Sequence, residues 1–486
     1  MRFYLYGLDP RQWKRWHSIA GQCQQLLTQQ QIAEGNPGTI LTDVNTLLEF
    51  VGPAGIATKS RNASIPADQL PELNQRVSHP IELSLKRALL RDYPNLAGVF
   101  ILLRVMELLK MKHSRLVVCP AALESWRRLN ATEQYFALLE ALLFHAQSSV
   151  LGGPRTTRED PQAFETIVSF LGQLSDRWRN FDHYESVRLL GPQGELPPWN
   201  LFVQQQLGLI EIRPRHFSEK ERRDWGGSGW LVGGAKLTPF GTAAAWAMLE
   251  FQKQKDETES AVDEGAAPLA DEPQLQFEVI PILPTSDETS NTDDDSSKPE
   301  WDEGEAEPEE LSEESGAEAT FGILQPVFQP YFPEWRIVYT RPDLEVRSGT
   351  HIFKVTLSGW RGGGGGIWRR IAVPPDASLD TLAGAILDAF KLGDDHLYDF
   401  RYRDQRGRSR VYHHPYTDEG PFTPEITVGE TDLGLKDKMR LTFDYGDYWQ
   451  FDVRLEKVEA EPCRLKQPKV IESEGKAPEQ YPNSEW

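Results

Sequence analysis

Residues 441–455 read LTFDYGDYWQFDVRL, and this stretch decides the fold of the last third of the chain. Apolar and polar residues alternate on both sides of Gly446, as in strands with one buried face. A glycine between two alternating runs is typical of a tight turn. The stretch therefore predicts a β-hairpin. Its apolar positions are Leu441, Phe443, Tyr445, Trp449, Phe451, Val453 and Leu455.

Two alternating runs lie further upstream, at residues 353–357 and 367–373. Five consecutive glycines, Gly362–Gly366, separate them. A glycine run between two strands is suited to a mobile hairpin tip. This region therefore predicts a second pair of strands.

A helix with one apolar face follows the second pair. Ser378 is its expected cap and Gly393 its expected end, and a strand is expected at residues 397–403. Strand pair, helix and further strands is a β-grasp-like order. The sequence thus predicts a C-terminal β-grasp-like α+β domain over residues 335–462 and a flexible tail over 463–486.

The first 180 residues predict a mostly α-helical N-terminal region. Trp13, Trp16 and Ala20 follow one another at three- and four-residue steps, the spacing of one helix face. A capping pattern at Thr132 opens another helix. The expected helices cover residues 11–33, 81–111 (divided in two by Pro94), 132–146 and 161–178.

Residues 185–252 predict a winged-helix-like unit. A helix over Trp199–Leu207 and a short strand precede a basic, glycine-rich excursion, which we call the wing. A second strand follows, and then Thr238 as N-cap with Pro239 at the first helical position. The LTPFG stretch that opens this helix is similar to the turn that ends many bacterial winged helices.

The excess charge is concentrated in residues 256–318, which carry 23 acidic residues and one basic residue, Lys298. The whole chain has a formal net charge of −21, so this segment holds essentially all of the excess. Such a composition cannot bury enough apolar surface to offset the entropy of ordering the chain. We therefore expect an acidic disordered linker over residues 256–320. The alternative is an acidic arm that lies over the wing and competes with nucleic acid.

The start of the chain and the cysteines indicate neither export nor a metal site. Met1–Pro10 lacks a basic region followed by an apolar core, so no signal peptide is expected. The most apolar stretch, Leu96–Leu109, is too short and too charged to span a bilayer. Cys23, Cys119 and Cys463 are too far apart for a disulfide framework or a zinc knuckle. The sequence therefore predicts a cytoplasmic protein.

Five motifs in the last domain resemble, in order, those of the Ri-plasmid (pRiA-type) Orf-three-like family. They cover about a quarter of the chain. The helical region over 47–146 is more loosely similar to the segment that often precedes this domain. The motifs are HIFKVTL at 351–357, IWRRI and VP at 367–374 with the helix at 379–390, DHLYDF at 395–400, FDYGDYW at 443–449 and APEQY at 477–481.

This resemblance implies a bacterial or archaeal family that is often encoded beside mobile elements and has no established activity. Many members have the motif HLH where this chain has His396-Leu397-Tyr398. Many also have a histidine where this chain has Phe451. A metal or proton-transfer site built on those histidines in relatives is therefore not expected here.

The candidate ligand or polar site consists of His396, Asp444, Asp447 and Arg369. His396 and the two aspartates could meet at one end of the sheet as a metal site. The alternative is that the aspartates accept N–H groups of the hairpin turn. Arg369 could bind an anion or pair with a local carboxylate. Trp449 and Trp368 are expected in the core.

A weaker candidate is the wing, as a nucleic-acid contact. Acidic residues stand among its basic residues, so a solvated wing is the alternative. The basic residues are Arg213, Arg215, Lys220, Arg222 and Arg223.

No catalytic residue, metal ligand or cofactor is predicted, because no phosphate-binding, nucleophile-elbow or zinc-protease motif occurs in a proper context. We therefore expect a non-enzymatic interaction or accessory protein with an unidentified protein partner. The first alternative is a DNA-binding accessory protein of mobile elements that uses the wing. The second is a metal-dependent enzyme at the C-terminal domain.

Overall fold

The computed structural model describes residues 8–58, 65–83, 85, 87–112, 115–151, 163–182, 196–215, 231–263, 320–342, 347–359, 366–418 and 420–480. The chain divides into two units. One consists of Met1–Glu250 with Leu311–Trp486, and the other of Phe251–Glu310. The N-terminal helices and the C-terminal sheet thus belong to the same unit.

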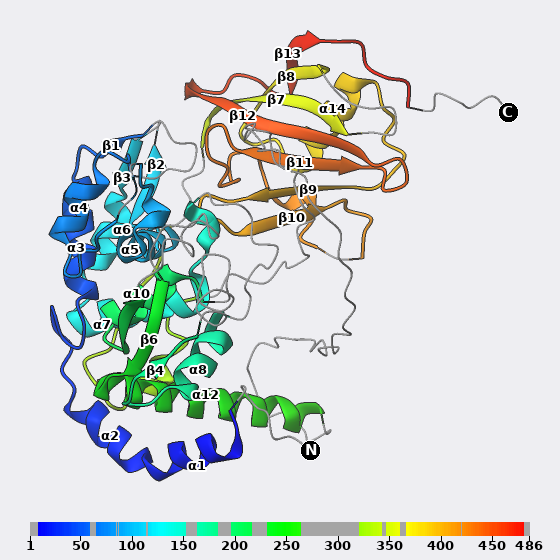
Figure 1. The fold of residues 1–486 in the computed structure, drawn as a ribbon. Coiled ribbons are helices and arrows are strands. Elements are labelled where there is room, and N and C mark those ends of the chain that lie inside the picture. Colours follow the sequence, from blue (N-terminus) through cyan, green and yellow to red (C-terminus); the bar gives the residue numbers. More distant parts are fainter. Residues whose placement is uncertain are drawn as a thin grey trace, which may run out of the picture. The chain divides into compact units, whose positions relative to one another are not determined.

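Short helices build the N-terminal region, with α5 at its centre (Figure 1). Every residue of α5 is buried. Gly98 permits the close approach of α10, because a Cβ at this position would lie 2.3 Å from Val203 Cγ2. No helix in the described part of the chain combines the length and apolar character that crossing a membrane requires. The helices are α1 (Pro10–Ser18), α2 (Ala20–Gln29), α3 (Ile40–Val51), α4 (Leu70–Arg76), α5 (Pro94–Val105), α6 (Pro120–Arg127), α7 (Ala131–Glu140), α8 (Ala163–Gln173) and α10 (Pro198–Gln206).

The helices predicted over 81–111 are wrong at both ends. Before Pro94 the described residues form only a short turn, η2 (Leu90–Asp92), and Leu85 and Leu89 are exposed, so no apolar face is buried there. After α5 the chain turns at Glu107, whose φ of 61° is incompatible with a continuing helix. A three-stranded antiparallel sheet of order β1-β3-β2 follows. Its strands are β1 (Ile56–Ala57), β2 (Leu109–Lys112) and β3 (Arg115–Val118).

The other predicted helices form, with shifted ends. The helix expected over 11–33 breaks at Ile19 into α1 and α2. The N-cap of α7 is Asn130 rather than Thr132. Its side chain accepts the Glu133 N–H, and the Glu133 carboxylate accepts the Asn130 N–H. This reciprocal pair satisfies two N–H groups that a helix start otherwise leaves unbonded.

Helix, strand, strand and helix follow one another as predicted after residue 196, but a winged helix is not confirmed. Most of the wing, residues 216–230, lies outside the described residues. Thr238 caps α12 as expected, since its Oγ1 accepts the Gly241 N–H at 2.8 Å. α12 continues to Asp263, so the first eight residues of the predicted linker are helical, and the linker from 264 to 319 is not described. The elements after α10 are β5 (Ile210–Arg215), β6 (Leu231–Leu237) and α12 (Pro239–Asp263), and β4 (Arg179–Asn180) pairs with β6.

The C-terminal region is a seven-stranded sheet of order β10-β9-β11-β12-β7-β8-β13, with α14 against one face (Figure 1). Every pair is antiparallel. The predicted α+β class and the 441–455 hairpin are confirmed, and the β-grasp-like arrangement is not. The elements are β7 (Gly349–Gly359), β8 (Trp368–Val373), α14 (Leu379–Phe390), β9 (Tyr398–Arg403), β10 (Ser409–His413), β11 (Lys438–Phe443), β12 (Trp449–Pro462) and β13 (Lys469–Glu474).

Two details of this sheet correct the prediction. Lys391, in the left-handed conformation at φ 60°, ends α14, two residues before the expected Gly393. Residues 469–474, expected within a flexible tail, form β13 and pair with β8. An ion pair between Arg370 and Glu472 adds to this pairing. The glycine run falls mostly outside the described residues.

The two faces of the sheet differ in character. One face packs on α14 through residues such as Phe353, Phe400 and Phe443, all fully buried. The opposite face, which we call the polar face, carries the intervening residues of each strand, because side chains alternate along a strand. The polar face therefore holds many of the charged side chains of the domain's strands, but not Arg369, which is buried beside the end of α14.

Residues 320–342, which we call the connecting segment, pack on α7. The ring of Trp335 stacks on Phe136 at 4.3 Å between centroids with an interplanar angle of 4°. Phe328 and Phe332 also contact the Phe136 ring, at 4.9 and 5.1 Å. Trp335, Phe328 and Phe332 are all buried. The segment that precedes the C-terminal sheet is thus part of the helical core.

Two buried carboxylates of α7 hold the backbone of the connecting segment. Glu133 accepts the N–H groups of Arg336 and Ile337 at 2.9 and 2.7 Å. Glu140 accepts those of Gly322 and Leu324 at 2.6 and 2.7 Å. The first contact spans more than 200 residues of sequence. Burial raises the pKa of Glu140 to about 7, although the two N–H groups oppose this shift.

The raised pKa of Glu140 predicts a pH-dependent stability. The folded protein retains the Glu140 proton to higher pH than the unfolded chain does, so the free energy of unfolding falls as the pH rises from about 4.5 to about 7. We expect this group to contribute a fall of about 2–3 kcal/mol. Urea unfolding at about pH 5 and about pH 8 measures it.

Glu140→Gln is the matched control, because the amide keeps one acceptor oxygen and does not titrate. The difference in unfolding free energy between the two pH values is expected to be smaller by that amount in the variant. Equal pH dependence in both proteins would show that Glu140 does not titrate in this range.

Candidate functional site

Three loops meet at one end of the C-terminal sheet, where β10 and β11 finish and β9 and β12 begin. We call residues 394–398, 414–418 and 444–448 together the tyrosine end. Asp444, at φ 55°, starts the turn, and its Oδ1 accepts the N–H groups of Gly446 and Asp447 at 2.9 and 3.3 Å. Tyr448, at φ 57°, donates its N–H to Asp444 O. Hydrogen bonds within the FDYGDYW stretch thus hold the conformation of this turn.

The structure brings His396 and Asp444 together, with 3.5 Å between His396 Nε2 and Asp444 Oδ2. Asp444 is buried, whereas the His396 side chain is 40% exposed. Asp447 contributes its backbone N–H to the turn. The described residues contain no group of three or more His, Cys, Asp or Glu side chains that could hold a metal ion. The hydrogen bonds of Asp444 therefore agree with the alternative interpretation of the sequence, in which this aspartate accepts N–H groups of the hairpin turn.

Three tyrosines are exposed at this end, and their surroundings orient them. Tyr416, Tyr445 and Tyr448 are 86%, 47% and 46% exposed. The Tyr445 hydroxyl donates to the buried Asp399 at 2.9 Å. The Tyr416 ring lies 5.1 Å from His414, which in turn packs on Tyr398. The hydroxyl of Tyr445 and the ring of Tyr416 thus both have neighbours that limit their movement.

Acidic residues surround these tyrosines. The three loops contain five aspartates and no Lys or Arg. One of them, Asp395, has a side chain that is 55% exposed. The end of the sheet is therefore both aromatic and negatively charged. The aspartates are Asp394, Asp395, Asp418, Asp444 and Asp447.

Arg369 is not available as an anion site. Its Nε donates to Ala389 O at 3.0 Å and its Nη1 to Trp368 O and Glu474 O at 2.8 Å. Cations at a helix C-terminus interact favourably with the last carbonyl groups. Arg369 is buried and joins the end of α14 to β8 and β13. The structure thus gives it a structural role that differs from both sequence interpretations.

Trp368 lies on the polar face, which corrects the expected core position, whereas Trp449 is buried as expected. The side chain of Lys354 lies 4.6 Å from the Trp368 ring centroid, and the guanidinium of Arg370 lies 5.4 Å from it. Such contacts between cations and an aromatic ring are favourable. Sequence reasoning missed this site because an aromatic residue in an alternating run is usually an apolar core residue.

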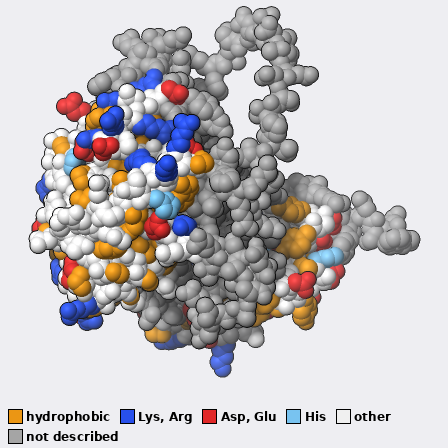
Figure 2. Space-filling model, turned by 90° about the horizontal axis from the view of Figure 1, so that it is seen from below, with side chains coloured by type: hydrophobic (Ala, Val, Ile, Leu, Met, Phe, Trp, Pro, Cys, Tyr) orange, Lys and Arg blue, Asp and Glu red, His pale blue; other side chains and the backbone are white. Residues whose placement is uncertain are grey.

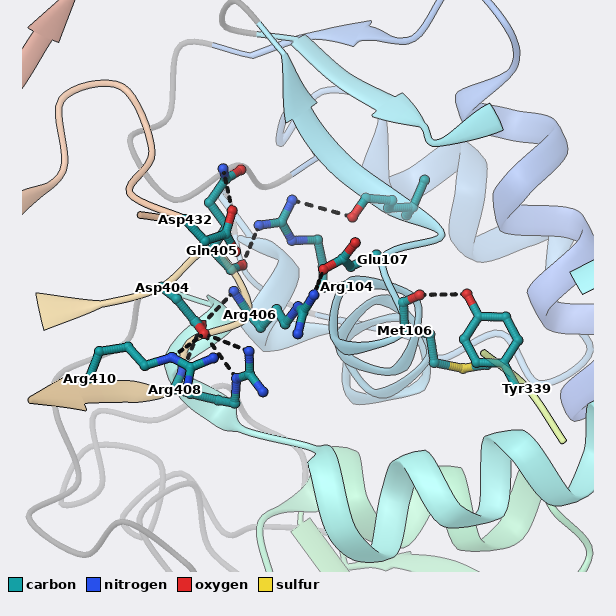
Figure 3. A network of polar contacts seen from close by, with 11 residues as sticks. Arg104, Met106, Glu107, Tyr339, Asp404, Gln405, Arg406, Arg408, Arg410 and Asp432 are labelled. Atoms are coloured by element: carbon teal, nitrogen blue, oxygen red, sulfur yellow. Dashed lines mark hydrogen bonds and ion pairs between the residues drawn. The ribbon is translucent and has the colours of Figure 1, made fainter. Parts of the chain in front are cut away.

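A buried polar network joins α5 to the loop between β9 and β10 (Figure 3). Arg104 donates through Nη2 to Gln405 O at 2.6 Å, and Arg406 pairs with Glu107. Asp404 accepts the N–H groups of Arg406 and Arg408 at 2.9 and 3.0 Å. The network was not predicted, since its partners lie about 300 residues apart in the sequence.

The electrostatics of this network follow from its burial. Burial, together with the positive charge of the neighbouring Arg408, lowers the pKa of Arg406 to about 10. Burial raises the pKa of Asp437 to about 6, and it also raises that of Asp432. Backbone carbonyls and paired charges surround this network. We therefore infer that its role is to stabilise the fold of the unit.

Only part of the basic wing can be located. Arg213 and Arg215 lie in β5, and the Arg213 guanidinium lies 4.9 Å from the Trp178 ring. Lys220, Arg222 and Arg223 lie outside the described residues. Figure 2 views the molecule from below relative to Figure 1. On the face that it shows, basic, acidic and apolar side chains of the described residues lie close together.

The motifs of the C-terminal sheet are matched by one protein family. Residues 350–481 match the family model described as plasmid pRiA4b ORF-3-like protein. This match confirms the predicted resemblance and covers β7 to β13. The plasmid pRiA4b ORF-3-like match begins after the connecting segment, and its description names no activity.

The other comparisons add little to this. The chain is similar to a protein of unknown function from Methanosarcina mazei Go1, whose crystal structure is known, at 25% sequence identity. That similarity covers 26% of this chain and 71% of the other, with a TM-score of 0.23. No curated protein matches the chain.

Proposed function

We propose that the protein is a non-enzymatic interaction protein whose C-terminal domain binds a partner protein through the tyrosine end. The observation that carries this proposal is the group of exposed tyrosines, Tyr416, Tyr445 and Tyr448, on loops fixed at one end of a sheet. Tyrosine is enriched at protein interfaces because it offers a large, rigid contact area and a hydroxyl. Scattered single aromatics need no explanation, but a group of them at one site does.

The charge at this end indicates the chemistry of the partner. Five aspartates accompany the tyrosines, so a segment rich in Lys or Arg is complementary to them. Aromatic rings also attract cations directly. The hydrogen bond from Tyr445 to Asp399 supports binding further, because a side chain that is already oriented loses less entropy on binding.

The alternative functions remain predictions. DNA binding through the wing depends on Lys220, Arg222 and Arg223, which lie outside the described residues. An enzyme would need His396, Asp444 and Asp447 to act on one substrate. Metal-dependent hydrolase or nuclease turnover that is abolished by Asp447→Ala would contradict the proposal of a non-enzymatic protein.

Site-specific photo-cross-linking in the native host tests the proposal. A photoreactive benzoylphenylalanine replaces Tyr416 or Tyr448 in the full chain, and a third protein carries it in place of Val470, which is 42% exposed on β13. We expect one partner protein to be captured from both tyrosine positions, with or without nuclease, and not from position 470. Asp394→Lys with Asp395→Lys should reduce its capture at least tenfold.

A charge-matched variant, Asp376→Lys with Glu461→Lys, controls for net charge away from the tyrosine end. Its capture should equal that of the unchanged protein. Different proteins at the two tyrosine positions, equal capture at position 470, or loss of capture after nuclease treatment would each contradict a protein interface at this end.

A further inference from the structure

The chain that leaves β13 runs from the edge of the sheet to the loop that follows α14. We call residues 475–480 the strap. Gly475, in the left-handed conformation at φ 74°, turns the chain out of β13. Just before it, Arg369 joins Glu474 O to Ala389 O, near the end of α14. The start of the strap is thus fixed beside the end of the helix.

The strap reaches the loop after α14 through Gln480, which uses both ends of its side-chain amide. Gln480 Oε1 accepts the Gly393 N–H at 2.6 Å, and Nε2 donates to Asp395 Oδ1 at 3.0 Å. A side-chain amide carries an acceptor and two donor hydrogens on one planar group. Gln480 therefore bridges a backbone N–H and a carboxylate of the same loop.

This loop, residues 391–397, contains neither helix nor strand. Backbone hydrogen bonds hold it near both ends, from Leu392 N–H to Leu387 O and from Asp444 N–H to Leu397 O. Gln480 holds the part between these two points. Most of the loop belongs to the tyrosine end, so the strap contacts the site of the proposed partner.

Asp395 connects the strap to the turn between β11 and β12. Asp395 Oδ2 lies 3.9 Å from His396 Nε2, which lies 3.5 Å from Asp444 Oδ2. Asp444 in turn accepts backbone N–H groups of the turn. A line of polar contacts therefore runs from Gln480 to the turn that carries two of the exposed tyrosines.

The contact with Asp395 fixes the carboxylate without removing its charge. The amide of Gln480 is neutral, and the Asp395 side chain is still 55% exposed. A strap that blocked the site would have to cover this carboxylate or neutralise it with a cation. The geometry therefore favours a strap that orients the loop over one that blocks it.

We propose that the strap holds the acidic loop of the tyrosine end in its binding conformation, with Gln480 as the positioning residue. The attachment itself is independent of any partner, whereas its effect on binding rests on the proposed function. A loop that is ordered in advance loses less entropy on binding. Release of the strap therefore lowers the affinity for the partner.

Hydrogen exchange of the Gly393 amide, measured by NMR in the full chain with isotope-labelled glycine, tests the attachment. Gln480→Ala removes the acceptor of this N–H. It should speed the exchange about 2- to 12-fold, the range that corresponds to the net contribution of one hydrogen bond. Gln467→Ala makes the same substitution at an exposed position before β13 and should leave the exchange unchanged.

A paired variant separates the bridge from a general effect on the fold. Gln480→Glu places a second carboxylate against Asp395, and the repulsion should release the loop. Asp395→Asn combined with Gln480→Glu again sets a donor opposite an acceptor and keeps the net charge of the unchanged protein. This paired variant should return the exchange of the Gly393 amide to its original rate.

Photo-cross-linking from position 416 or 448 tests the effect on binding. Gln480→Ala should lower capture of the partner about 2- to 12-fold, because the loop must then be ordered when the partner binds. The paired variant should restore capture, and Gln467→Ala should capture as much as the unchanged protein.

The proposal is overturned if Gln480→Ala leaves the exchange of the Gly393 amide unchanged, if Gln467→Ala speeds it equally, or if the paired variant does not restore it. Faster exchange with undiminished capture would remove the role of the strap in binding but leave the partner interface intact. If the unchanged protein captures no partner, the proposed function fails, and the exchange rates decide whether the strap holds the loop. Urea unfolding of each variant shows whether the fold keeps its stability.

Discussion

Trp335→Ala is expected to lower the free energy of unfolding by about 3–5 kcal/mol, the usual cost of deleting a large buried aromatic side chain. The Trp335 ring is 1% exposed and lies flat on Phe136. Its removal leaves a cavity between α7 and the connecting segment. Urea unfolding followed by circular dichroism measures the loss.

The position of Trp335 also predicts where the variant becomes sensitive to protease. The segment from Phe321 to Tyr339 is held by Glu133, Glu140 and the aromatic contacts, so loss of the central ring should open cleavage sites there at low urea concentrations. Trp178→Ala is the matched control, because Trp178 is 39% exposed. A loss below about 1 kcal/mol for Trp335→Ala would mean that the stack does not hold the segment.

Asp404→Ala is expected to cost a similar amount, about 3–5 kcal/mol, for a different reason. The Asp404 side chain is almost fully buried, and it accepts Arg408 and Arg410 Nε at 2.9 and 3.1 Å besides two backbone N–H groups. Its removal leaves Arg408 and Arg410 without their shared anion (Figure 3). The unfolding free energy in urea is again the measurement.

Asp404→Asn separates the two roles of this side chain. The amide oxygen can still accept the backbone N–H groups but carries no charge, so this variant should lose less than Asp404→Ala. Glu72→Ala, which removes an exposed ion pair with Arg76, should cost about 1 kcal/mol or less. A similar small loss in all three variants would show that the buried network does not stabilise the unit.

Local patterns were enough to predict the elements that depend on local contacts. The hairpin around Gly446 and α14 follow from alternation, spacing and a serine cap, and both are confirmed. The strand β2 was missed, because its apolar residues continue the run of α5 and look like more helix. The strand β3 lies beyond the predicted helix, where no element was predicted. The connecting segment was missed for another reason. Its aromatic residues Phe328, Phe332 and Trp335 do follow at helical steps, but no local pattern indicates their partner, which lies on α7 about 200 residues earlier.

The candidate sites show the same limit. The sequence left two interpretations of Asp444 open; its carboxylate accepts N–H groups of the turn and also lies 3.5 Å from His396 Nε2. The alignment of Lys438, Lys354 and Arg370 on the polar face could not be predicted, since each occupies an ordinary outward position in a separate strand. Only the strand order and register bring them together. Arg369 and Arg370 are neighbours in the sequence, yet one binds backbone carbonyls in the interior and the other pairs with carboxylates on the polar face.

The contacts between the helices and the later part of the chain have a consequence for how the gene can be divided. The family match starts at residue 350, but Gln405 and Arg406, which lie after that boundary, contact Arg104 and Glu107, which lie before it. The connecting segment, also before the boundary, packs on α7. A gene fragment cut at this boundary would encode a sheet without the anchor of its β9–β10 loop. Removal of residues 320–486 would expose the aromatic side chains of α7 to solvent, and exposed apolar surface favours aggregation. Two fragments that together cover the chain, with residues 320–342 included in one of them, should therefore yield more soluble protein when they are co-expressed than either fragment yields alone.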